Sequence, residues 1–82
     1  MITNRLREVR ERRLREASDP SVWTQEGLAL RVGISRQTII AIEKGVYNPS
    51  LDLAFKLARA FDLQIEEIFT FESEEGSEEA EA

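Results

Sequence analysis

Arginine, glutamine and threonine stand in succession at positions 36 to 38, and all three carry hydrogen-bonding groups suited to a nucleic acid. A glutamine amide can form two hydrogen bonds with an adenine edge, and an arginine guanidinium can do the same with O6 and N7 of guanine. A threonine can contact a phosphate or the methyl group of thymine. The chemistry that Arg36, Gln37 and Thr38 indicate is therefore hydrogen bonding to base edges and to the backbone beside them.

The segment that carries these residues has the pattern of a short helix. Ser35 is a suitable N-cap, and we expect the helix to cover residues 35–44 and to end at Gly45. Ile39 and Ile42 fall on its inner side, with Ile40 at the edge. The opposite face is polar, small and uncharged except at its end, which would let the helix approach bases closely; it is formed by Gln37, Ala41 and Lys44. The alternative is that Arg36 and Gln37 are ordinary surface residues of a first turn.

A second helix precedes this one. Thr24 is its candidate N-cap, and Gly33 can adopt the positive φ that ends it. Two short helices joined by Gly33 and Ile34 have the spacing of a helix-turn-helix.

The remaining periodicity predicts three more helices and no strand, although residues 69–71 could be extended. A long first helix begins near Asn4 or Thr3, and the fourth begins at the capping residue Ser50. The fold class expected is all-α, a compact arrangement of five helices over residues 3–17, 24–32, 35–44, 50–61 and 63–69.

Charge is divided unevenly along the chain. The net charge is −5, but six of the sixteen acidic residues lie in the last eleven positions. Residues 1–71 carry 11 basic and 10 acidic groups, and six of the arginines fall within residues 5–15. We interpret residues 1–71 as one domain and residues 72–82 as a disordered acidic tail.

The composition removes several classes of function. The chain has no cysteine and no histidine, so thiol nucleophiles, imidazole acid–base chemistry and the usual zinc ligands are missing. The carboxylates are scattered or lie in the tail, without paired acid–base geometry. We expect no enzyme, no metal, no cofactor and no small-molecule ligand, and the short apolar runs predict a cytoplasmic protein without a membrane span.

One ion pair follows from the helical faces. Arg10 lies near the apolar side of the first helix, and Glu43 lies beside Ile39 and Ile42 on the inner side of the third. Inward charges need partners, so we predict a structural salt bridge between Arg10 and Glu43.

The segment TQEGLALRVGISRQTIIAIEKGVYNPSLDLAFKLARAF resembles the Xre family of short, single-domain regulators, which have the helix-turn-helix of phage repressors and Cro. The resemblance covers residues 2–71 with one interruption. It implies a repressor-like DNA-binding domain, and a sequence-specific transcriptional regulator of double-stranded DNA, expected to be a repressor and a homodimer. The alternative is an antitoxin-like or other protein-interaction module with the same fold.

The resemblance also implies roles for individual residues. Arg36, Gln37, Thr38 and Ala41 would read the major groove from the helix that Ser35 caps. Phosphate contacts would come from Gln25, which would also brace the reading helix, and from Lys44, Tyr47, Asn48 and Ser50. For Tyr47 a packing role under its loop remains an alternative.

The chain departs from the family in an insertion at about residues 14–23, LREASDPSVW. We hypothesise that Val22, Trp23 and Leu30 form a small apolar cluster over it. Phe69 and Phe71 are candidate dimer contacts, the alternative being that they only close the core.

Overall fold

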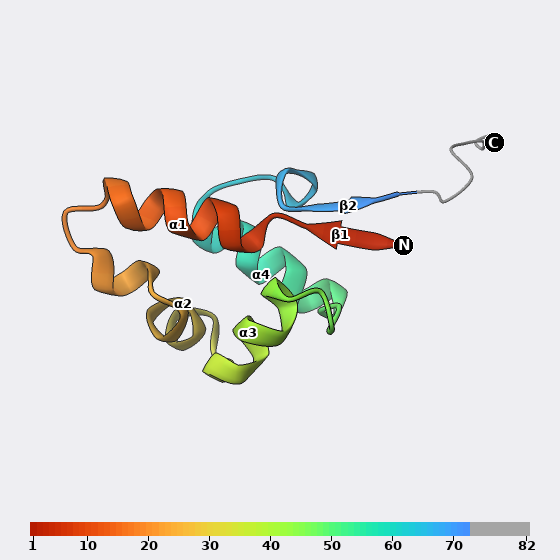
Figure 1. The fold of residues 1–82 in the computed structure, drawn as a ribbon, viewed down its shortest axis with the longest axis horizontal. Coiled ribbons are helices and arrows are strands. Elements are labelled where there is room, and N and C mark those ends of the chain that lie inside the picture. Colours follow the sequence, from red (N-terminus) through yellow and green to blue (C-terminus); the bar gives the residue numbers. More distant parts are fainter. Residues whose placement is uncertain (73–82) are drawn as a thin grey trace.

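The computed structural model describes residues 1–72, and the acidic tail beyond Glu72 lies outside the described residues. Within this range the chain forms four α-helices and one two-stranded sheet (Figure 1). The helices are α1 (Leu6–Glu16), α2 (Gln25–Val32), α3 (Arg36–Glu43) and α4 (Leu51–Phe61), and the strands are β1 (Ile2–Asn4) and β2 (Phe69–Phe71). None of these helices is long and apolar enough to cross a membrane.

The small sheet corrects two expectations. The predicted first helix starts at Leu6 rather than at Thr3, because residues 2–4 pair antiparallel with residues 69–71. The predicted fifth helix is wrong: residues 63–69 contain only a 3₁₀ turn, Ile65–Glu67, and then enter β2. Three-residue strands carry too little alternation to be recognised locally, and the two partners lie far apart in the chain. The five-helix, all-α description therefore becomes four helices with a β1–β2 sheet.

The predicted caps of the other helices are present. The hydroxyls of Thr24, Ser35 and Ser50 each accept a hydrogen bond from the backbone N–H three residues later, which satisfies one free donor of the first turn. Gly33 ends α2 with φ of 80°, a left-handed conformation that favours glycine. These local signals fix where α2 and α3 begin and how the turn between them runs.

The core lies where all four helices meet. Leu6 from α1, Leu28 from α2, Ile39 from α3 and Phe61 from α4 are fully buried. In Figure 1, α1 lies across one side of the molecule, with α2 and α3 on the other side and α4 packed behind them. The inner face of α3 is thus held by the core, and its outer face stays available.

The predicted insertion folds as the end of α1 followed by a 3₁₀ turn, Pro20–Trp23, that returns to α2. The hypothesis of a Val22, Trp23 and Leu30 cluster is wrong, because Leu30 is 75% exposed and Val22 is also exposed. Trp23 instead stacks on Phe61, with ring centroids 4.9 Å apart. The hypothesis assumed that Trp23 and Leu30 lie on one face of a helix. Trp23 lies in the 3₁₀ turn before α2, so helical periodicity does not place its side chain beside that of Leu30.

The 3₁₀ turn lies directly against Gly27 of α2. A Cβ atom at this glycine would stand 2.1 Å from the backbone oxygen of Ser21 and 3.0 Å from backbone atoms of Val22. The glycine that weakens the helix by about 1 kcal/mol in propensity is therefore the residue that lets the inserted turn pack on it.

Candidate nucleic-acid interface

The helix α3 shows its two faces clearly. Ile39 and Ile42 are fully buried, whereas Arg36, Gln37 and Lys44 are exposed. Ala41 and Thr38 are half-buried and lie between these faces. The helix therefore presents an outer surface whose first turn carries the guanidinium and amide groups suited to base edges.

The first turn of α3 is held by two hydroxyl groups. The Thr38 N–H donates to Ser35 Oγ at 3.2 Å, and the two side-chain oxygens of Ser35 and Thr38 are 2.9 Å apart. Ser35 is thus occupied as the cap, and its hydroxyl orients that of Thr38. If Ser35 donates in this contact, the Thr38 hydroxyl keeps its own hydrogen for a phosphate.

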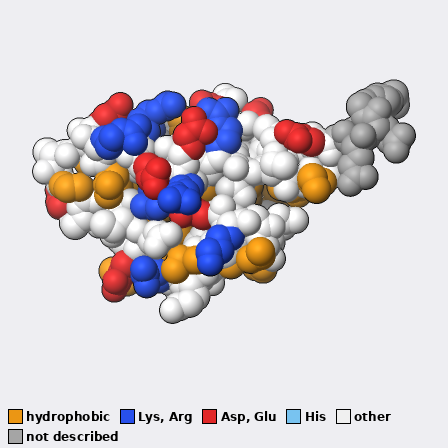
Figure 2. Space-filling model, viewed as in Figure 1, with side chains coloured by type: hydrophobic (Ala, Val, Ile, Leu, Met, Phe, Trp, Pro, Cys, Tyr) orange, Lys and Arg blue, Asp and Glu red, His pale blue; other side chains and the backbone are white. Residues whose placement is uncertain are grey.

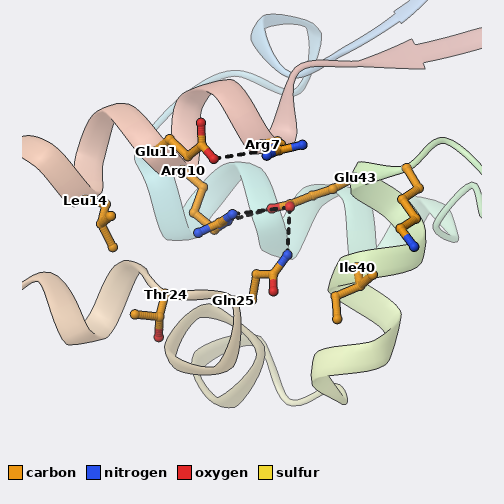
Figure 3. A pocket seen from close by; sticks show the side chains of 9 residues that line it. Arg7, Arg10, Glu11, Leu14, Thr24, Gln25, Ile40 and Glu43 are labelled. Atoms are coloured by element: carbon orange, nitrogen blue, oxygen red, sulfur yellow. Dashed lines mark hydrogen bonds and ion pairs between the residues drawn. The ribbon is translucent and has the colours of Figure 1, made fainter.

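A buried network joins the two helices of the helix-turn-helix, α2 and α3, to α1 (Figure 3). Glu43 accepts from Arg10 Nε at 2.6 Å and from Arg10 Nη2 at 3.3 Å, and the two side chains are only 4% and 9% exposed. Gln25 Nε2 donates to the same carboxylate at 3.1 Å. The ion pair that the sequence predicts is present, and Gln25 adds a third member, so that α1, α2 and α3 are tied together at Glu43.

Gln25 stands at the edge of an open pocket of about 430 Å³ between α1, the start of α2 and α3. In Figure 3, Arg7 and Glu11 lie above the pocket on α1, and Ile40 faces it from α3. Because one amide hydrogen of Gln25 is donated to Glu43, the second hydrogen remains for a phosphate or a water, and the side-chain oxygen can accept from a water. Gln25 therefore braces α3 through Glu43, whichever further contact it makes.

The loop after α3 offers further donors. Lys44 and Asn48 are exposed, and Tyr47 is 45% exposed, which does not support a packing role under the loop. Ser50 caps α4 by accepting from the Leu53 N–H at 3.2 Å, and the amides of the first turn of α4 form a partial positive charge there. Val46, 76% exposed between Lys44 and Tyr47, was not identified in the sequence, because an apolar loop residue carries no signal of its own.

Two arginines that could be taken from the sequence as DNA contacts instead bind other parts of the domain. Arg13 Nη2 donates to the carbonyl oxygen of Phe61 at 2.6 Å, and Arg31 Nη2 donates to that of Ala60 at 3.1 Å. Both guanidinium groups also lie over the ring of Trp23, at 5.4 and 4.4 Å from its centroid. They thus neutralise the negative end of α4 and hold the inserted turn.

The other arginines of α1 are mixed with acidic groups. Arg7 pairs with Glu11 at 3.1 Å, and Arg5 and Arg12 lie 3.6 and 3.9 Å from Glu8. Figure 2 shows the Lys and Arg side chains interspersed with Asp and Glu over this side of the molecule. Such exposed pairs are weak, but they reduce the positive field of α1. Among residues 1–72, no three acidic, Cys or His side chains are grouped as metal ligands would be.

The two candidate dimer residues differ in exposure. Phe69 is half-buried against the core, and Phe71 is 76% exposed. In the sheet, Ile2 lies opposite Phe71, so these two side chains and that of Phe69 share one face. The structure therefore brings both phenylalanines together with the start of the chain.

Comparison with known proteins adds independent information. A family model described as helix-turn-helix matches residues 6–68. An uncharacterized HTH-type transcriptional regulator of Methanocaldococcus jannaschii is 64% identical over 52 residues, which cover 63% of this chain and 79% of that protein. One of Archaeoglobus fulgidus is 54% identical over 63 residues, covering 77% and 89%. One of Bacillus subtilis is 50% identical over 52 residues, covering 63% and 79%.

Proposed function

Because this chain belongs to the Xre and Cro/C1 type of the helix-turn-helix family, which comprises DNA-binding transcriptional regulators, we propose that it recognises one double-stranded DNA sequence and represses transcription there. The observation that carries this proposal is the division of α3. Its inner residues Ile39 and Ile42 are fully buried, and Arg36 and Gln37 project from its first turn. A helix held in this way can enter the major groove as a rigid element, with its N-terminal residues at the base edges.

The chemistry of each side chain indicates which part of the DNA it would contact. Arg36 suits guanine and Gln37 suits adenine, while the small side chain of Ala41 allows the groove floor to come close. Thr38 would offer its hydroxyl to a phosphate or its methyl group to the methyl of a thymine. Phosphates on either side would be held by Gln25, Lys44, Tyr47, Asn48 and the first-turn amides of α4 at Ser50.

The nearly neutral charge of residues 1–71 supports a binding mode in which specific contacts matter more than general electrostatic attraction to DNA. Residues 1–71 have 11 basic and 10 acidic groups, and Arg10 and Arg13 are engaged within the fold. Few cations remain to neutralise phosphates, so the dependence of affinity on salt should be shallow. A single small module reads few base pairs, and we therefore infer a homodimer that reads two half-sites.

The test is the selection of bound sequences from random DNA by the full chain, with Arg36→Ala and Gln37→Ala in parallel. Each variant should lose preference at one position of the recovered motif, worth about 1–3 kcal/mol of discrimination. Arg59→Ala is the matched control, since Arg59 is an exposed arginine near the far end of α4 and should leave the motif unchanged.

Repression is tested by transcription in vitro from a template that carries the recovered motif across its promoter. Addition of the protein should lower transcript yield, and the Gln37→Ala variant should do so less. If selection enriches no motif, the proposal is wrong, and the protein-interaction module becomes the better interpretation of the fold.

A further inference from the structure

The chain carries two regions of opposite net charge. Residues 1–71 have 11 basic and 10 acidic groups, a net charge of +1. Residues 72–82, the acidic tail, contain six glutamates and no basic residue, a net charge of −6. Carboxylates at this density compete with phosphates for the same lysine and arginine side chains. The tail can therefore act on the domain wherever unpaired cations lie within its reach.

The described part of the chain ends on the side of the domain where α3 ends. The Glu72 N–H donates to the Met1 carbonyl oxygen at 2.7 Å, which joins the end of β2 to the start of β1. The Asn4 side chain of β1 in turn donates to the Ile42 carbonyl oxygen at 2.9 Å, near the end of α3. Met1 and Lys44 line one open pocket of about 320 Å³. The segment after Glu72 therefore leaves the domain beside the C-terminal end of the helix that we propose for the major groove.

The exposed cations of α3 have no acidic partner among the described residues. Arg36 stands in the first turn and Lys44 directly follows the last, and neither forms an ion pair within this part of the chain. Glu43, the only acidic residue of α3, is buried with Arg10. On α1, by contrast, three exposed arginines are paired with glutamates. The proposed DNA-binding side of the domain thus offers unpaired positive charge to an anion.

The acidic tail is long enough to reach both cations. Ten residues follow Glu72, and an extended chain of that length spans up to about 33 Å. The eight residues of α3 span only about 12 Å. The carboxylates can therefore reach Lys44 and Arg36 without any change in the domain. Because the tail is joined covalently to the domain, it meets these cations at an effective concentration on the order of 1 mM.

We propose that the carboxylates of residues 73–82 bind Lys44 and Arg36 in the free protein and compete there with the phosphates of DNA. The consequence for DNA rests on the proposed function, whereas the contact itself does not. The tail must leave before any duplex can enter, so it weakens binding to the recognised motif and to unrelated DNA by the same factor. It therefore sets how much protein is bound at a given salt concentration, while the side chains of α3 set which sequence is bound.

The size of the effect follows from the number of cations involved. Two exposed ion pairs together favour the tail-bound state by about tenfold at low salt. Neutralising the tail frees both cations to displace counterions from DNA, which steepens the dependence of log affinity on log salt by about 1.8. Between 50 and 200 mM salt this steeper dependence amounts to about tenfold in affinity. The tail should thus weaken DNA binding at the lower concentration and have almost no effect at the higher one.

The first experiment tests the contact without DNA, by carbodiimide coupling, which joins a carboxylate to an amine that it touches. The chain has two lysines, Lys44 after α3 and Lys56 on α4, and both are exposed. Peptide mapping of coupled protein of single-chain mass should find residues 73–82 joined to Lys44 several times more often than to Lys56. At about 0.5 M salt the preference should vanish, because the ion pairs are screened. Equal coupling to the two lysines at low salt, or none to Lys44, overturns the proposal.

The second experiment measures DNA affinity after the charges of the tail are removed. The neutral-tail variant keeps the full chain and carries Glu74→Gln, Glu75→Gln, Glu78→Gln, Glu79→Gln and Glu81→Gln. At 50 mM salt it should bind the recognised motif and an unrelated duplex about tenfold more tightly than wild type, and at 200 mM about equally. Ser73→Ala/Ser77→Ala is the matched control, since it alters the same segment, keeps every carboxylate and should bind as wild type.

Two lysine backgrounds separate a direct contact from general repulsion between the tail and DNA. In a Lys44→Gln chain, neutralising the tail should raise affinity only about threefold, since one of the two ion pairs is already lost. In a Lys56→Gln chain it should keep the full gain of about tenfold. Equal gains in the two backgrounds, a gain for one class of DNA alone or no gain at 50 mM salt overturns the proposal.

These outcomes distinguish this proposal from the proposed function. Preferred coupling to Lys44 and a salt-dependent gain on unrelated DNA, with no enriched motif, support the tail contact and contradict the proposed function. An enriched motif, together with equal coupling to the two lysines and an unchanged affinity of the neutral-tail variant, supports the proposed function and contradicts the tail contact.

Discussion

Replacing Glu43 by alanine should destabilise the fold by about 3–5 kcal/mol, the range found when one partner of a buried ion pair is removed. The structure gives the reason for choosing this range. The substitution removes three hydrogen bonds, two from Arg10 and one from Gln25, and leaves the Arg10 side chain, 9% exposed in the native fold, without its acidic partner. The only other hydrogen bond that the Arg10 side chain makes among the described residues is a 3.3 Å contact with the carbonyl oxygen of Trp23.

The assay is urea unfolding followed by the fluorescence of Trp23, the single tryptophan, which is stacked on Phe61 in the core. A domain of this length has a total stability of about 4–12 kcal/mol, so Glu43→Ala should leave it close to unfolding. Glu43→Gln, which keeps the shape and one acceptor, should cost less. The double variant Arg10→Met/Glu43→Leu should recover most of the loss, since no charge is then stranded in the interior.

A loss under about 0.5 kcal/mol for Glu43→Ala would refute the argument, because exposed ion pairs contribute only that much. A double variant as unstable as the single one would also contradict it. In that case the loss would come from packing around Glu43 and not from the unpaired charge on Arg10.

Three further substitutions test other contacts of the fold. Gly27→Ala should destabilise the fold by about 1–3 kcal/mol despite the better helix propensity of alanine, because the new Cβ meets the backbone of Ser21. If that contact were absent, urea unfolding would show a more stable fold. Asn4→Ala should lower the free energy of unfolding by about 1–2 kcal/mol, because it removes two hydrogen bonds. Asn4 Nδ2 donates to the Ile42 carbonyl oxygen at 2.9 Å, and Asn4 Oδ1 accepts from the Leu6 N–H at 3.0 Å. An unchanged unfolding midpoint would mean that water replaces both bonds. Leu30→Lys should change stability by less than about 0.5 kcal/mol, and a larger loss would mean that Leu30 is buried against the inserted turn after all.

The helix-turn-helix could be predicted from the sequence because its signals are local. Thr24, Ser35 and Ser50 cap within three residues, and Gly33 ends its helix by a conformation that few other residues adopt. The Arg10–Glu43 pair could also be inferred, since two inward charges on neighbouring helices have few other partners. Gln25 as the third member could not, because its direction depends on the packing of α2 against α3.

The sheet and the inserted turn could not be predicted, because both depend on contacts distant in the chain. Thr3 and Thr70 meet through their hydroxyls at 2.9 Å, but nothing near Thr3 distinguishes a strand from the start of a helix. Arg13 and Arg31 resemble surface charges in the sequence, and only the fold shows that they bond the last carbonyls of α4. The roles of the exposed residues in DNA binding stay predictions that the proposed selection would test.

The β1–β2 sheet also affects the order in which parts of the chain fold during its synthesis. The ammonium group of Met1 and the backbone of Glu72 bond each other at 3.0 Å, and the Glu72 N–H returns a bond to Met1 at 2.7 Å. A growing chain can form α2 and α3 from local contacts soon after they leave the ribosome, whereas β1 has no partner until residues 69–71 follow. Until then Ile2 has no neighbour in the sheet, so the pairing of β1 with β2 is the last step of folding and waits until residues 69–71 have left the ribosome.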